Sequence, residues 1–264
     1  MITEAGKMEG TATFNPEIIR AKNLVKIYAT GVTGLNGLNL SISRGEMVGI
    51  LGASGSGKTT FFRLLNGSIT PTRGELFVLG KRLGRLPYKS LQKLRSRMAL
   101  VYQNHNIIPG LTVAQNVLMG RLGKVSLLRA VRMALLQTNK ELEDIHHVLD
   151  QLGLADKMFH LATDLSGGQQ QRVAIARALF SDAEIILADE PIASVDYKTA
   201  ETVLTLLKNL NRDKQTTIIM NLHQQDFALN FCPRVVVLDK GNLVYDGPPE
   251  NWICGGRKNI VSGK

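Results

Sequence analysis

The chain has 264 residues, of which 44% are hydrophobic and 20% are charged, and its formal net charge is +10. These proportions are close to globular averages and exclude a disordered chain, and the length suffices for one large α/β domain with an inserted subdomain. No apolar run approaches the roughly eighteen residues of a membrane-spanning helix, and the N-terminus lacks the apolar segment of a signal peptide, so we expect the protein to stay in the cytoplasm.

Short apolar runs alternate with helical patterns along the chain. Several runs are almost continuously hydrophobic, which is typical of strands covered on both faces of a parallel sheet. The last run follows a Lys240-Gly241 turn and is expected to be an antiparallel hairpin partner. The pattern predicts an α/β fold with a mostly parallel central sheet and an antiparallel β portion. The runs expected as strands are 24–28, 47–51, 76–79, 98–102, 185–188, 216–221, 234–239 and 242–246.

The section from about 104 to 165 has a different, helical pattern. Thr112 is expected to cap a helix that reaches Met119. Residues 127–136 and 141–152 are also helix-periodic, and the second stretch ends at Gly153. We interpret this section as a helical subdomain inserted into the α/β core.

A glycine-rich loop follows the apolar run 47–51. It matches G-x-x-x-x-G-K-[ST] directly after a strand and before a helical run, which is the context that a P-loop requires. Glycines let backbone N–H groups turn inward around an anion, and the helix N-terminus adds partial positive charge. Lys58 would contact the β- and γ-phosphates, and the Thr59 hydroxyl would bind Mg²⁺. The nucleotide-contacting residues of the loop are Gly52, Ala53, Ser54, Gly55, Ser56, Gly57, Lys58, Thr59 and Thr60.

A second motif is the run from Glu184, which ends in Asp189 and Glu190. In P-loop enzymes an Asp at the end of such a strand holds Mg²⁺. The Glu that follows is placed to polarise the attacking water as a general base. The pair carries little information alone, but together with a P-loop it predicts hydrolysis of a nucleotide.

A third motif opens a helix expected over 170–180. Ser166 is an N-cap, and two glycines after it leave N–H groups open, which predicts a second phosphate-binding helix start. A plain cap would need only Ser166. The motif consists of Leu165, Ser166, Gly167, Gly168 and Gln169.

These three motifs together resemble the nucleotide-binding subunits of ABC transporters, over residues from about 20 to 250. The resemblance implies an adenine-stacking role for Tyr28, and a Q-loop residue, Gln103, that contacts Mg²⁺ and the permease. It implies a D-loop at Ser194, Val195 and Asp196, and a switch histidine, His223, at the γ-phosphate. The catalytic residues would be Glu190, His223 and Gln103, and the Mg²⁺ ligands Thr59, Gln103 and Asp189.

The resemblance also implies an assembly. The P-loop of one subunit and the Leu165–Gln169 motif of its partner would face one ATP, so that two nucleotides lie in a head-to-tail homodimer. Two transmembrane permease subunits and an external substrate-binding protein would complete the complex at the cytoplasmic face of the membrane. We expect a flexible extension over residues 1–19, the ATP-binding domain over 20–250, and a tail over 251–264.

Several segments look most like the ATPase subunits of phosphonate importers, among them Asn106–Gly123 and Asn221–Gln224. This implies uptake of a phosphonate or of a related oxyanion such as phosphite or phosphate. Another importer or a lipoprotein-extracting ABC system is an alternative, as is a soluble ABC ATPase acting on nucleic acid.

The nucleic-acid alternative derives from one basic segment. From Lys81 to Lys140 there are 12 Lys or Arg residues and no Asp or Glu. Such a segment suits nucleic acid, an anionic membrane surface or an acidic protein. Because Gln103 lies inside it, we expect it to face the permease and membrane, with Arg95, Arg97 and Arg121 as probes of coupling, and we expect no nucleic-acid partner.

Overall fold

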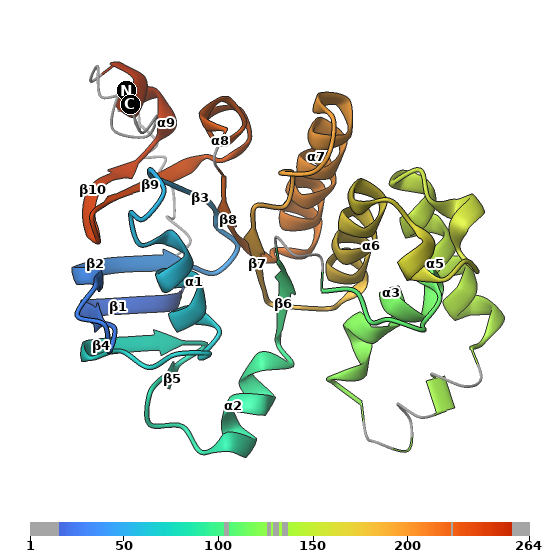
Figure 1. Cartoon of the computed structure of the whole chain (residues 1–264), viewed down its shortest axis with the longest axis horizontal. Helices are drawn as coiled ribbons and strands as arrows, with labels where there is room; N and C mark the ends of the chain where they lie inside the picture. The colour runs from blue at the N-terminus through green and yellow to red at the C-terminus, as the bar shows by residue number, and fades with distance from the viewer. Residues whose placement is uncertain are drawn as a thin grey trace, which may run out of the picture.

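The computed structural model describes residues 16–102, 106–125, 128, 132–133, 137–222 and 224–254. Two sheets and a group of helices make up the fold (Figure 1). The first sheet is antiparallel and has the strand order β2-β1-β4-β5. Its strands are β1 (Glu17–Ile27), β2 (Thr33–Ser43), β4 (Arg73–Val78) and β5 (Lys81–Arg82).

The second sheet has the order β10-β9-β3-β8-β7-β6. All of its neighbouring strands run parallel except the β9–β10 pair, which is the predicted antiparallel hairpin. The predicted fold class is therefore confirmed. Its strands are β3 (Met47–Leu51), β6 (Met98–Val101), β7 (Ile185–Asp189), β8 (Thr217–Asn221), β9 (Arg234–Asp239) and β10 (Asn242–Gly247).

Alternating side chains of the parallel strands reach two separate hydrophobic cores. Val48 and Ile50 of β3 join the core that contains the antiparallel sheet and Phe61 of α1, whereas Met47 and Leu51 join the core that contains the helical section. Both faces of the parallel sheet are therefore covered, as the continuous apolar runs indicated. The helix between the two sheets, α1 (Lys58–Leu65), buries six of its eight residues.

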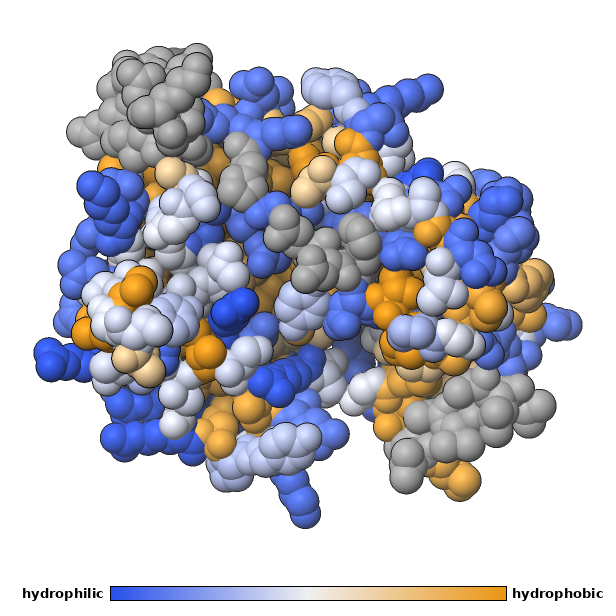
Figure 2. All heavy atoms as spheres, viewed as in Figure 1, coloured by the Kyte–Doolittle hydropathy of each residue, from blue (hydrophilic) through white to orange (hydrophobic). Residues whose placement is uncertain are grey.

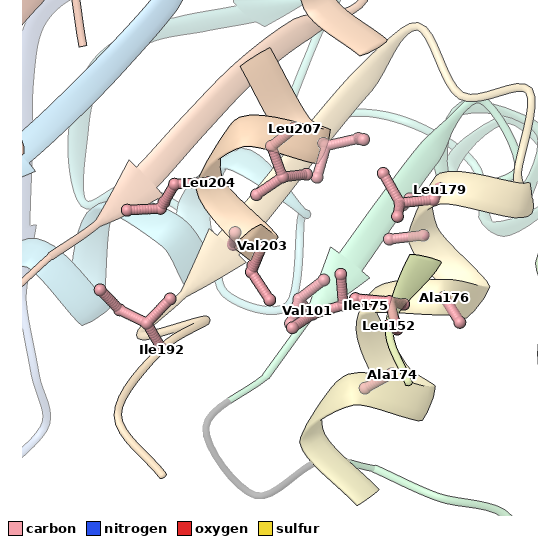
Figure 3. Close-up of a cluster of buried hydrophobic side chains, with 14 of the residues drawn as sticks. Val101, Leu152, Ala174, Ile175, Ala176, Leu179, Ile192, Val203, Leu204 and Leu207 are labelled. Atoms are coloured by element: carbon pink, nitrogen blue, oxygen red, sulfur yellow. The ribbon is translucent and has the colours of Figure 1, made fainter. Parts of the chain in front are cut away.

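The remaining helices lie mainly on the other side of the parallel sheet. Figure 3 shows Val101 of β6 close to Ile175 of α6, with Val203, Leu204 and Leu207 of α7 in the same cluster. The same core contains Val117 and Leu149 of the helical section, so it joins that section to the sheet. The helices are α2 (Tyr88–Arg95), α3 (Val113–Leu122), α5 (Asn139–Gln151), α6 (Gly167–Phe180), α7 (Tyr197–Lys214), α8 (Gln225–Phe231) and α9 (Pro249–Cys254).

Hydroxyl caps fix the starts of the helices in the helical section. Thr112 accepts from the N–H of Gln115 at 3.2 Å, and the Gln115 side chain completes a capping box. Thr138 forms the same arrangement with Glu141 at the start of α5. The predicted cap at Thr112 is confirmed, although α3 continues three residues past Met119 to Leu122, which packs against the core.

The structure differs from the sequence predictions at both ends of the domain. The first strand begins at Glu17, before the predicted boundary at residue 20. At the other end, α9 extends past residue 250 and Trp252 is only 1% exposed, packed on Tyr245. Both segments bury apolar side chains. Most of the predicted helix 127–136 lies outside the described residues.

In the described ranges, no helix is both long and apolar enough to span a lipid bilayer. Hydrophilic residues cover most of the face in Figure 2, and apolar residues form scattered groups on it.

Candidate functional site

Glycines shape the loop between β3 and α1. Gly52, Gly55 and Gly57 have φ angles of 152°, 78° and 107°, which L side chains rarely adopt. A Cβ atom at Gly52 would lie 2.3 Å from the Leu238 carbonyl oxygen, and one at Gly57 would lie 2.4 Å from that of Gly34. Both positions therefore require glycine, and the loop has the shape that the P-loop motif predicts.

The start of α1 lies open at the end of this loop. Among the described residues no side chain caps the helix at Gly57, and no acidic residue occupies its first turn. The first backbone N–H groups and the helix dipole are therefore available to an anion. Ser56 is 2% exposed, and its Oγ has no hydrogen-bond partner within the described part of the chain. The loop thus offers both backbone and side-chain donors to a phosphate.

Lys58 is buried against the same loop. Its Nζ donates to the carbonyl oxygens of Gly52 at 2.6 Å and Ala53 at 2.9 Å. Burial lowers the pKa of Lys58, while Glu190 and Asp189 act in the opposite direction. The ammonium group is thus held at the loop, close enough to the two carboxylates to interact with them electrostatically.

A cleft of about 520 Å³ brings the predicted residues together. It is lined by Ser54 to Thr60 of the loop, by Tyr28 and Val32 of the turn between β1 and β2, and by Glu190 and Asn221. Its volume is in the range of small-molecule sites. The Tyr28 hydroxyl lies 3.0 Å from the Thr60 Oγ1. Tyr28 is therefore at the mouth of the loop, where an aromatic ring can contact a nucleotide base.

The two carboxylates of the second motif lie at the end of β7. Asp189 is its last residue, and Glu190 follows with a φ of 56°, in the left-handed region. Such a conformation costs about 1–3 kcal/mol and persists only where the surroundings hold it. The Glu190 N–H donates to the Asn221 carbonyl oxygen at 3.1 Å, and the Gln171 side chain donates to the Pro191 carbonyl oxygen at 2.9 Å.

A second cleft of about 410 Å³ adjoins the first, since Thr59 lines both. Thr59 and Asp189, two of the three predicted Mg²⁺ ligands, line it with Tyr102 and Asn106. A hydroxyl and a carboxylate are hard oxygen donors of the kind that Mg²⁺ prefers, with phosphates and waters completing its shell. The residues present fit a Mg-nucleotide. The third ligand, Gln103, lies outside the described residues, as does His223.

The third motif lies apart from these clefts. Ser166 caps α6 and forms a capping box with Gln169, whose side chain accepts from the Ser166 N–H at 3.0 Å. A Cβ at Gly168 would be 2.8 Å from the Ser194 carbonyl oxygen. Local structure thus accounts for Gln169 and Gly168 as well as Ser166, contrary to the sequence argument that a cap explains only the serine. Leu165 is 7% exposed, and none of the five residues lines either cleft.

The predicted D-loop connects the third motif with the carboxylates. Asp196 caps α7, accepting from the N–H and the hydroxyl of Thr199 at 2.9 and 2.6 Å. The Thr199 hydroxyl lowers the pKa of Asp196. A Cβ atom at Gly168 would meet Ser194 and Val195, so these two residues lie next to Gly168. The start of α6 therefore packs on the loop that leaves Glu190.

The basic segment is partly neutralised inside the chain. Arg97 pairs with Glu184, and Arg121 lies 3.6 Å from Asp182 and stacks on Phe180 at 3.9 Å. Arg95 donates to two backbone carbonyl oxygens. The three arginines thus have partners inside the chain, and the expectation that they report on coupling stays a prediction. Among the exposed cations of the segment that form no ion pair with another described residue are Lys81, Arg85, Lys89 and Lys93.

Sequence reasoning missed the site roles of Gln171 and Asn221. Both are almost fully buried polar residues that touch the segment 189–191. The available signal was an asparagine that ends an apolar strand, which is an unusual polar residue to bury.

Comparisons with known proteins agree with this geometry. The family model described as ABC transporter matches residues 35–193. The chain is 41% identical over 233 residues to a phosphonates import ATP-binding protein of Halalkalibacterium halodurans, which covers 88% of this chain and 89% of that protein. A relative of the same description in Lactococcus lactis is 38% identical and covers 88% and 94%. A dimeric ATP-binding cassette in a post-hydrolysis state, bound to ADP and Pi, is 34% identical with a TM-score of 0.74, and covers 88% and 98%.

Proposed function

This chain belongs to the ABC transporter family, and on that premise we propose that it is the ATP-hydrolysing subunit of an importer for a phosphonate or a related oxyanion. The observation that supports this most is the 520 Å³ cleft. The glycine-rich loop 52–57, which we call the anion cradle, lines it together with the buried Lys58 and the carboxylate residue Glu190. A nucleotide-hydrolysing site needs these three components together.

The residues of the cleft have separable tasks in hydrolysis. The N–H groups of the loop and the start of α1 hold the phosphates, and Lys58 exchanges its two backbone carbonyl partners for phosphate oxygens. Glu190 is the general base that orients and deprotonates the attacking water. When bound, Mg²⁺ neutralises developing negative charge on the phosphates. Thr59, Asp189 and Gln103 would hold the ion, and His223 would act at the γ-phosphate.

None of the residues of the third motif is among those that line the cleft. We propose a head-to-tail homodimer in which Leu165, Ser166, Gly167, Gly168 and Gln169 of one subunit close over the ATP of the other. The dimeric arrangement of the ADP-bound neighbour supports this. The contact between Gly168 and Ser194 lets closure at the third motif act on the loop that follows Glu190.

The relatives named as phosphonate import proteins support the cargo. We propose that two permease subunits and an external substrate-binding protein complete the complex, with this chain on the cytoplasmic face of the membrane. The internal pairing of Arg97 and Arg121 weakens the case for a nucleic-acid partner. We propose residues 17–254 as the ATP-binding domain.

The test is uptake by cells that carry the complete transport system. Cells should take up a labelled alkylphosphonate with this chain and lose uptake with a Glu190→Gln chain. Competition by excess phosphite or phosphate would identify the oxyanion preferred. Unchanged phosphonate uptake in the Glu190→Gln cells would contradict the proposal.

A further inference from the structure

Asn221 forms hydrogen bonds with both carboxylate residues of the second motif, Asp189 and Glu190. It ends β8, directly opposite Asp189 of β7 in the parallel register, and is 1% exposed. Its Nδ2 donates to the Asp189 Oδ1 at 2.6 Å. This is a short bond to a charged acceptor, so it belongs to the stronger class of hydrogen bonds. It sets the rotation of the carboxylate that faces the Thr59 cleft.

The same residue also holds Glu190 through its backbone. The Asn221 carbonyl oxygen accepts from the Glu190 N–H at 3.1 Å, at the residue whose φ is 56°. A single residue of β8 therefore fixes the side chain of Asp189 and the backbone of Glu190. A shift of Asn221 would move both groups.

The other end of the Asn221 amide is its carbonyl oxygen, Oδ1. Its Oδ1 is buried and has no hydrogen bond within the described residues, although Asn221 lines the larger cleft. A buried amide oxygen without a donor is unfavourable, so it is expected to meet a donor when the site is filled.

A comparison within the chain separates this arrangement from an ordinary buried asparagine. Asn116 of α3 is 0% exposed and uses both ends of its amide. Its Oδ1 accepts from the Ile108 N–H at 2.9 Å, and its Nδ2 donates to backbone carbonyl oxygens, among them that of Thr112 at 3.1 Å. Both ends of the Asn116 amide thus have backbone partners, whereas the buried Oδ1 of Asn221, a residue that lines the cleft, has no donor among the described residues.

We propose that Asn221 is a positioning residue for the metal of the site. Its Nδ2 holds Asp189 in the rotamer that receives the hydrated ion, and its Oδ1 accepts a hydrogen bond from a water of the hydration shell. The inference rests on the proposed hydrolysis of Mg-ATP but concerns a residue outside the three motifs. Partners of this outer kind typically change metal affinity by about 10–100-fold.

The test measures metal and nucleotide binding separately. The full chain is saturated with a non-hydrolysable ATP analogue, and Mn²⁺ binding is followed by electron paramagnetic resonance. In Asn221→Ala the Mn²⁺ affinity should fall by about 10–100-fold, while the affinity for the analogue in excess EDTA stays at the parent value. Asn221→Leu fills the same space without donor or acceptor and should give the same loss.

The control is Asn211→Ala, at the opposite end of the β8 region. The Asn211 Nδ2 donates to the carbonyl oxygens of Gly45 at 2.7 Å and Thr216 at 2.8 Å. This variant should melt at a lower temperature but bind Mn²⁺ like the parent.

Each remaining outcome is decisive. Parent-like Mn²⁺ affinity in either folded Asn221 variant would overturn the inference. A loss of analogue affinity in EDTA as large as the loss of Mn²⁺ affinity would also overturn it, because that result indicates a purely structural role. If the parent chain itself binds neither analogue nor Mn²⁺, the proposed function fails, and the inference fails with it.

Discussion

Glu184 joins three segments at the end of the parallel sheet remote from the clefts. Its carboxylate accepts from Arg97, including a bond of 2.9 Å from Nη2, and from the Arg44 Nη2 at 2.7 Å. Hydrogen bonding from Arg97, followed by that from Arg44, lowers the pKa of Glu184 to about 2, against the effect of burial. The perturbation we consider is Glu184→Gln, which removes the charge at constant shape.

The magnitude follows from the pKa. A carboxyl group with an ordinary value of 4.5 and a folded value of about 2 corresponds to a ceiling of about 3 kcal/mol of folding free energy, at 1.36 kcal/mol per unit. The side chain is 28% exposed, so solvent screening reduces the expected value to about 1–2 kcal/mol. Because the folded pKa is the lower one, this stability is present above pH 4.5 and is lost as the pH falls towards 2.

Urea unfolding at a series of pH values measures this contribution. At pH 7 the native chain should be about 1–2 kcal/mol more stable than Glu184→Gln, and the difference should shrink as the pH is lowered below about 4.5. Asp213→Asn is the matched control, because its pair with Arg212 is 59% and 71% exposed, and it should change stability by less than about 1 kcal/mol. A difference at pH 7 that stays constant down to pH 3.5 would refute the reasoning.

The other predictions concern the anion cradle and the basic surface. Lys58→Ala should lose the thermal stabilisation by Mg-ATP, which for the native chain is about 2.7 kcal/mol when the ligand concentration is one hundred times Kd. A native-like melting shift in the variant would contradict the role of Lys58. Replacing the exposed Lys89 and Lys93 by Glu should preserve folding and basal ATPase activity but weaken binding of the chain to membranes that contain the permease. Unchanged binding would rule out the surface around Lys89 and Lys93 as the contact. Arg121→Glu should instead lower the melting temperature, because it disrupts the stacking on Phe180 and the pairing with Asp182; unchanged stability would count against an internal role.

The continuous apolar runs allowed most of the parallel sheet to be predicted, because strands buried on both faces carry a simple pattern. The strand β2 was missed. Its buried residues Leu38, Leu40 and Ile42 alternate, but Leu35 is out of phase with them, and the pairing with β1 shifts register several times. Such irregularities break the period of two on which strand prediction depends.

The residues of the anion cradle could be predicted because they are contiguous in the chain, and the positive φ angles of the loop require glycine at fixed positions before the lysine. The role of Asn221 could not, because it depends on the pairing of β7 with β8, two strands that are separated by all of α7 in the chain. The roles of Arg95, Arg97 and Arg121 were missed for the same reason. Their partners, such as Glu184 and Asp182, lie far away in the sequence.

We propose that this chain hydrolyses ATP with Glu190 as the base, in a dimer that closes over the nucleotide. The most direct measurement compares the native chain with Glu190→Gln by ATP turnover and by size-exclusion chromatography in Mg-ATP. We predict that the variant binds ATP, turns it over about 10²–10⁴ times more slowly, and elutes as a dimer. Near-native turnover, or a variant that binds ATP but remains monomeric, would contradict the account.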